Sequence, residues 1–189
     1  VRKSKTLLMH IFYFLISLGL EFQCAEAAER QLTLVGENHS NIKGMKYCYD
    51  EINKYLNNNP QDRLNFFVEK DRKRLENAFK EVNYLSGIDI FNIDDNQALR
   101  VFRAHIKGLR EQTDPNLYKQ VYTNIIGKPN ENGLIENRFW FLKIINDFSK
   151  IINGISVFPI DGSFEQVTNH PSFKQVLNSN SLICGYYEG

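Results

Sequence analysis

The stretch LTLVGENHSN, residues 32 to 41, joins an apolar segment to two polar residues that can carry chemistry. Leucine, threonine and valine suit a β-strand, and Gly36 permits a sharp turn at its end. Glu37 and His39 follow at once, and the next residues, serine and asparagine, commonly cap helices. The stretch therefore predicts a strand, a polar turn and a helix in that order.

The rest of the chain continues this alternation. Apolar residues three and four positions apart indicate amphipathic helices, and short apolar runs between turn residues indicate strands. Strands are predicted at residues 31–35, 64–68, 155–160 and 181–184, and helices at 41–56, 75–87, 94–112, 114–127, 134–152 and after Pro171. Such alternation predicts an α/β fold with a mainly parallel β-sheet flanked by helices.

The N-terminal residues 1–27 have the pattern of a secretory signal peptide. VRKSK carries three positive charges, an apolar run follows, and the small residues Ala25 and Ala27 precede a cleavage point. A retained membrane anchor is the alternative, but the apolar run is short for a span. We expect a secreted or periplasmic protein with no stable transmembrane span and a single α/β domain at residues 28–189.

Composition narrows the classes of partner and of site. At 189 residues and 42% hydrophobic, the chain is long enough to bury one core. The formal net charge is +1 and no basic stripe occurs, so nucleic acid is not an expected partner. Cys48 and Cys184 either pair as a disulfide in the exported chain or are two small buried hydrophobic residues.

Polar residues follow three of the predicted strands. Glu37 and His39 follow the first, Glu69 the second and Asp161 the third. Ligands of parallel sheets bind at the carboxyl ends of the strands, so these side chains are expected on adjacent strands facing one pocket. An ionised glutamate beside a histidine raises the pKa of the imidazole and orients its ring, so the histidine can act as a general base. Two carboxylates and a histidine can equally bind a divalent metal. Each residue alone is equally explained as an ordinary strand-end polar residue.

Together, LTLVGENHSN, the following helix and LNFFVEK resemble the opening of the erythromycin-esterase/ChaN-like superfamily, related in fold to the TraB and Tiki proteins. In that superfamily a strand runs into Gly-x-x-His, a helix follows, and the second strand ends in glutamate. The resemblance covers residues 31 to 72 and implies that Glu37, His39 and Glu69 form the first cluster of the site. Members hydrolyse esters or peptides, or bind haem iron at the cell surface, so the fold does not decide the chemistry.

One feature departs from the family. A second histidine near a later strand is usual there, whereas this chain has GYYEG after its last predicted strand. Either Glu188 substitutes for that histidine or the protein is a truncated relative. Of the remaining histidines, His170 precedes Pro171 and either starts the following helix or reaches the site to supply its second half. His105 lies near an apolar helix face and suits the core.

These observations lead to three alternative functions. The first is an exported hydrolase acting on an ester or peptide bond of a small-molecule or peptide substrate. In it His39 is the general base, Glu37 orients it, and Glu69 assists or joins Glu37 and His39 around a divalent metal. Arg138 and Asp161 are the candidate substrate-binding residues, although Arg138 is also explained as a solvated helical charge. The second alternative binds haem or a metal without turnover, and the third is a secreted interaction protein that has lost catalysis.

Overall fold

The structure is a computed structural model that describes residues 30–36, 43–111, 128–151, 153–160 and 179–185. All of the helices and strands below belong to the compact unit Gln31–Gly189. The helices predicted at 114–127 and after Pro171 lie outside the described residues, as do residues 1–27.

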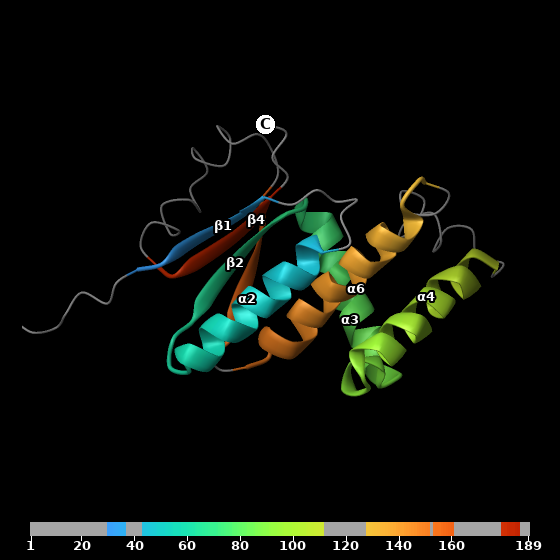
Figure 1. Cartoon of the computed structure of the whole chain (residues 1–189), viewed down its shortest axis with the longest axis horizontal. Coiled ribbons are helices and arrows are strands. Elements are labelled where there is room, and N and C mark those ends of the chain that lie inside the picture. Colours follow the sequence, from blue (N-terminus) through green and yellow to red (C-terminus); the bar gives the residue numbers. More distant parts are fainter. Residues whose placement is uncertain (1–29, 37–42, 112–127, 152, 161–178, 186–189) are drawn as a thin grey trace, which may run out of the picture. The chain divides into compact units, whose positions relative to one another are not determined.

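Four parallel strands form one sheet, which confirms the predicted α/β fold (Figure 1). The strands are β1 (Leu32–Gly36), β2 (Leu64–Glu69), β3 (Ile155–Ile160) and β4 (Ser181–Gly185). Their order across the sheet is β1-β4-β2-β3, so the strand that comes last along the chain lies between the first two. The side chains of β2 are buried on both faces of the sheet, since consecutive Phe66 and Phe67 are 0% and 1% exposed, which accounts for its nearly unbroken apolar run.

In the described residues, five helices accompany the strands, and aspartates cap the starts of two of them. They are α2 (Gly44–Asn58), α3 (Arg72–Gly87), the short 3₁₀-helix η1 (Ile90–Asn92), α4 (Asp95–Glu111) and α6 (Glu131–Phe148). Asp71 caps α3 by accepting a hydrogen bond from the backbone of Arg74 at 2.8 Å. Asp94 does the same for α4, since its side chain accepts from the backbone of Gln97 at 3.3 Å.

One face of the sheet packs against the helix layer. The alternation of side chains along a strand places Phe66 of β2 and Leu182 of β4 in one row, and both are buried in the common core. Helix α6 contacts α2, α3 and α4, and it lies between α2 and α4 in Figure 1. Buried Phe139 and Leu142 on α6 therefore join the helices to this core.

The opposite face carries a second apolar row. Leu34, Ile183, Phe67 and Phe158 are register partners across the four strands, and the rings of Phe67 and Phe158 stack with centroids 5.0 Å apart. Phe67 is buried, whereas Leu34 on the edge strand β1 is 64% exposed. Apolar exposure on this face therefore concentrates at β1, the edge of the described sheet.

Polar contacts join α2, α4 and α6, and all of the side chains in them except the exposed Asp95 are buried or half-buried. The Tyr49 hydroxyl donates to Asp147 at 2.9 Å, and Lys143 forms ion pairs with Asp147 at 3.1 Å and Asp95 at 3.4 Å. Burial, and then the hydrogen bond to Asp147, raise the pKa of Tyr49 far above its ordinary range. The three helices are thus held by partnered charges in addition to apolar packing.

Among the helices that the structure describes, none is both long enough and apolar enough to cross a bilayer.

Candidate functional site

The carboxyl ends of the four parallel strands define the candidate site. These ends are Gly36 in β1, Gly185 in β4, Glu69 in β2 and Ile160 in β3. Glu37 directly follows β1 and Asp161 directly follows β3, so the segments that carry them leave the sheet at the same edge as Glu69. The predicted strand ends thus converge on one edge.

The expectation that the strands of Glu37 and Glu69 are adjacent is wrong, because β4 lies between β1 and β2. The burial of β4 gives the physical reason: Leu182 and Cys184 are 3% and 1% exposed, as suits an interior strand. The carboxyl ends of β1 and β2 therefore flank the end of a third strand.

The predicted site residues divide into those that the structure describes and those that it does not. Glu69, Arg138 and His105 are described. Glu37, His39, Asp161, His170 and Glu188 lie outside the described residues.

Glu69 ends β2 as a half-buried carboxylate. The backbone directly after it is fixed, because the Lys70 amide donates to the carbonyl oxygens of Ile160 at 3.0 Å and Val68 at 2.8 Å. The Lys70 ammonium lies 4.9 Å from the centroid of the Phe141 ring on α6. The edge therefore presents a carboxylate and, next to it along the chain, a cation held toward the helix layer.

A pair of glycines occupies the last row of β1 and β4. Gly36 of β1 pairs with Gly185 of β4. One residue earlier, Cys184 of β4 pairs with Val68 of β2, and Glu69 follows Val68 at the end of β2. Neither glycine has a side chain to fill the space above its backbone. Glycines in strands mark places where a ligand or another backbone approaches closely. The carboxyl edge of the described sheet therefore ends in two glycines, of β1 and β4, and in Glu69 of β2.

Asn137 positions the start of α2, which follows the segment carrying Glu37 and His39. Its side-chain oxygen accepts a hydrogen bond from the backbone of Met45 at 3.1 Å, and the residue is 6% exposed. Sequence reasoning missed this contact. The available signal was the position of Asn137 between the inward-facing residues Ile135 and Phe139. A polar side chain buried there requires a hydrogen-bond partner.

Cys48 and Cys184 form a disulfide, which decides between the two readings of the cysteines. The bond joins α2 to β4, and both residues are buried, at 0% and 1% exposure. Because Cys184 directly precedes Gly185, the cross-link fixes the carboxyl end of β4 beneath α2. The site edge is therefore covalently tied to the helix layer.

Arg138 has an internal partner. It forms an ion pair with Glu81 of α3, with side chains only 14% and 10% exposed, and its guanidinium lies 5.9 Å from the Phe141 ring centroid. It is thus not a solvated helical charge. The contact joins α3 to α6 and neutralises the arginine within the protein.

His105 is half-buried on α4, at the border of the core. Its ring lies 5.6 Å from that of Tyr84, which is itself 59% exposed. Burial lowers the pKa of His105, and the charge of Glu81 acts in the opposite direction. The residue packs as an aromatic side chain, close to the expected core role.

Within the described ranges, no three histidine, cysteine or acidic side chains come together as a metal site. The predicted ligand set of Glu37, His39 and Glu69 has one member, Glu69, in those ranges. Comparisons of the chain with protein-family models, with curated proteins and with solved structures found no match. The resemblance to the erythromycin-esterase/ChaN-like superfamily thus stays a prediction from the Gly-Glu-Asn-His motif.

Proposed function

We propose that the protein is an exported hydrolase that cleaves an ester or peptide bond at the carboxyl edge of its sheet. The observation that carries the proposal is the parallel sheet, since it brings the ends of β1, β2 and β3 to one edge. In open parallel sheets this edge is where ligands bind. The segment with Glu37 and His39 begins at this edge, and Glu69 lies on it.

In the proposed reaction His39 is the general base. Its imidazole takes a proton from water, and the resulting hydroxide forms a bond to the substrate carbonyl carbon. The tetrahedral intermediate then expels the alcohol or amine, which takes the proton back from the imidazolium. Glu37 orients the histidine and favours its charged form, and Glu69 assists from the end of β2, on the far side of β4. The absence of side chains at Gly36 and Gly185 would permit the substrate to approach the ends of β1 and β4.

Export is supported by the Cys48–Cys184 disulfide. Disulfides form and persist in the periplasm and outside the cell, and they are rare in the cytosol. The bond agrees with the signal-peptide pattern of residues 1–27, which is an independent feature of the sequence.

The test compares His39→Ala with wild-type mature protein on nitrophenyl esters and fluorogenic peptides. We expect kcat/KM to fall by about a hundredfold or more, because a general base is lost. The free energy of unfolding should change by only about 0.5 kcal/mol, the range for residues outside the core. His105→Gln is the matched control, since it removes a histidine of α4 and should leave turnover unchanged.

Two outcomes contradict the proposal. One is a wild-type protein that hydrolyses none of these substrates, and the other is a His39→Ala variant as active as the wild type. Titration of the inactive protein with haemin and with zinc then tests the binding alternative, which requires uptake that His39→Ala weakens.

A further inference from the structure

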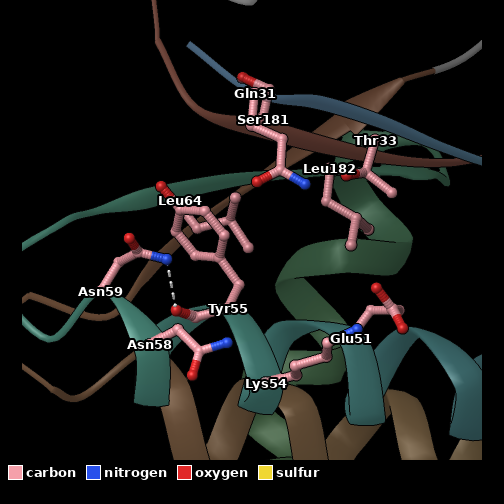
Figure 2. Close-up of a pocket in the computed structure, with 10 residues that line it drawn as sticks. All are labelled: Gln31, Thr33, Glu51, Lys54, Tyr55, Asn58, Asn59, Leu64, Ser181 and Leu182. Carbon is pink, nitrogen blue, oxygen red and sulfur yellow. Dashed lines mark hydrogen bonds between the residues drawn. The ribbon is translucent and has the colours of Figure 1, made fainter. Parts of the chain in front are cut away.

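A pocket lies at the opposite edge of the sheet, where the strands begin. It has a volume of about 120 Å³ and is enclosed by the first residues of β1, β2 and β4 above the C-terminal half of α2 (Figure 2). The residues that line it are Gln31, Thr33, Glu51, Lys54, Tyr55, Asn58, Asn59, Leu64, Ser181 and Leu182. Since Glu69 lies at the far end of β2, this pocket is separate from the proposed hydrolytic site.

The pocket has a buried floor and a polar mouth. Leu64, Ser181 and Leu182 are 3%, 1% and 3% exposed and form the floor. Lys54 and Asn58 are exposed at the mouth. Most of the lining is therefore polar, which favours a polar ligand over an apolar one.

A chain of hydrogen bonds fixes the wall formed by Tyr55. Its hydroxyl donates to Asp62 at 2.9 Å, and the Asn180 amide donates to the same carboxylate at 3.3 Å. Asn180 in turn accepts from the backbone of Gln31 at 2.9 Å, and Asn59 donates to the Tyr55 carbonyl at 3.0 Å, the dashed line in Figure 2. The wall is therefore preorganised, which reduces the ordering entropy that binding has to overcome.

Glu51 supplies the charge that selects a ligand. Its half-buried carboxylate lines the pocket on α2, and it makes no hydrogen bond or ion pair within the part of the chain that the structure describes (Figure 2). A partly buried carboxylate is stabilised by a cationic partner. The nearby C-terminal end of α2 adds partial negative charge, which also favours a ligand ammonium group.

Lys54 lies one helical turn after Glu51, at the mouth. No ion pair joins the two side chains within the described residues, so each can meet an opposite charge of one ligand. The lining carries one positive and one negative group, which matches a zwitterion better than a simple cation or anion.

The volume limits the size of that zwitterion. A pocket of about 120 Å³ corresponds to the liquid volume of about four water molecules. This is well below the range of about 300 to 1,000 Å³ for drug-sized ligands, which favours a ligand much smaller than haem or a nucleotide. A free amino acid with a small side chain is of that size.

We propose that the pocket binds a small free α-amino acid, with its ammonium group on Glu51 and its carboxylate toward Lys54. The inference does not depend on the proposed hydrolase activity, because the two sites lie at opposite ends of the strands. It gives the protein a small-molecule site outside the reaction it is proposed to catalyse.

The experiment is an NMR titration of the mature chain with L-alanine, following the backbone amides of Thr33, Tyr55 and Ser181. Ethylamine and propionate are the matched probes, since each keeps one charged group of alanine and lacks the other. We expect alanine to shift these amides and each probe to bind about tenfold more weakly or worse, as is usual when a charged hydrogen bond is lost.

Variants locate the site. Glu51→Gln should raise the Kd for alanine about tenfold or more, and Lys54→Met should raise it as well. Glu76→Gln, an exposed acid on α3 that does not line the pocket, should leave the Kd unchanged. Thermal melts check that each variant is folded, and the exposed position of Lys54 keeps a usable variant if Glu51→Gln does not fold. The proposal is overturned if alanine shifts none of these amides, if either probe binds as tightly, or if neither variant weakens binding.

Discussion

Reduction of the Cys48–Cys184 disulfide is expected to lower the free energy of unfolding by several kcal/mol. The two residues are 136 positions apart, and the chain-entropy relation gives about 5 kcal/mol for a loop of that length. Measured values for disulfides more often fall at about 2 to 4 kcal/mol, so the relation sets the upper end. At about 2 to 4 °C per kcal/mol for a domain of this size, the melting temperature should fall by about 10 °C.

The assay compares three samples of the mature chain by thermal and urea unfolding. These are the oxidised wild type, the wild type refolded in reductant, and the double variant Cys48→Ala with Cys184→Ala. The variant should melt near the reduced wild type and should not respond to reductant, because both lack the cross-link. If oxidised and reduced wild type unfold at the same temperature and urea concentration, the bond does not stabilise the fold and the reasoning fails.

Three further variants probe separate contacts. Phe67→Ala should lower the free energy of unfolding by about 3 to 5 kcal/mol in urea, because it opens a cavity under a buried strand; a loss below about 1 kcal/mol would place Phe67 at the surface. Arg138→Met should lower the free energy of unfolding by about 3 to 5 kcal/mol, because the buried Glu81 carboxylate loses the ion pair with Arg138. Adding Glu81→Gln to the same chain should restore much of this loss. If the losses of the two substitutions instead add, the two residues are not coupled. Burial and the hydrogen bond to Asp62 raise the pKa of Tyr55 to about 12. The contribution of the Tyr55 hydroxyl to the stability of the fold should therefore be complete below about pH 10 and be lost as the pH rises through 12. An absorbance titration in which Tyr55→Phe removes only a step near pH 10 would refute the raised pKa.

Element types and positions were readable from the sequence because they depend on local patterns. The strand predicted at 155–160 coincides with β3, and the strand predicted at 64–68 is one residue shorter than β2. Helix ends moved further: the helix predicted from residue 41 begins at Gly44 and continues to Asn58. Apolar periodicity defines the middle of a helix, whereas capping contacts define its ends.

The pairing of distant segments was not readable in the same way. LTLV in β1 and LIC in β4 have similar apolar character, yet β4 is buried between two strands and Leu34 of β1 is 64% exposed. The disulfide stayed undecided because it requires a specific separation and direction of the two cysteines, which sequence spacing does not supply. The ion pair of Arg138 with Glu81 joins residues 57 positions apart, so it too depends on how α3 packs against α6.

The place of β4 has a consequence for the order in which the protein can be assembled. Translation delivers β1 and β2 well before β4, and Gln31 at the start of β1 is 149 positions from its partner Asn180. Until residues 181–185 emerge, β1 lacks its neighbour in the described sheet, and the edges of β1 and β2 that β4 later covers remain open to non-native pairing. The described sheet therefore cannot form strand by strand in the order of synthesis. The pairing of β4 with β1 and β2 forms in a single late step between segments that are far apart in the sequence. If the chain is exported as proposed, this delay keeps the polypeptide unfolded for transfer across a membrane and leaves it dependent on holdase chaperones until β4 is made.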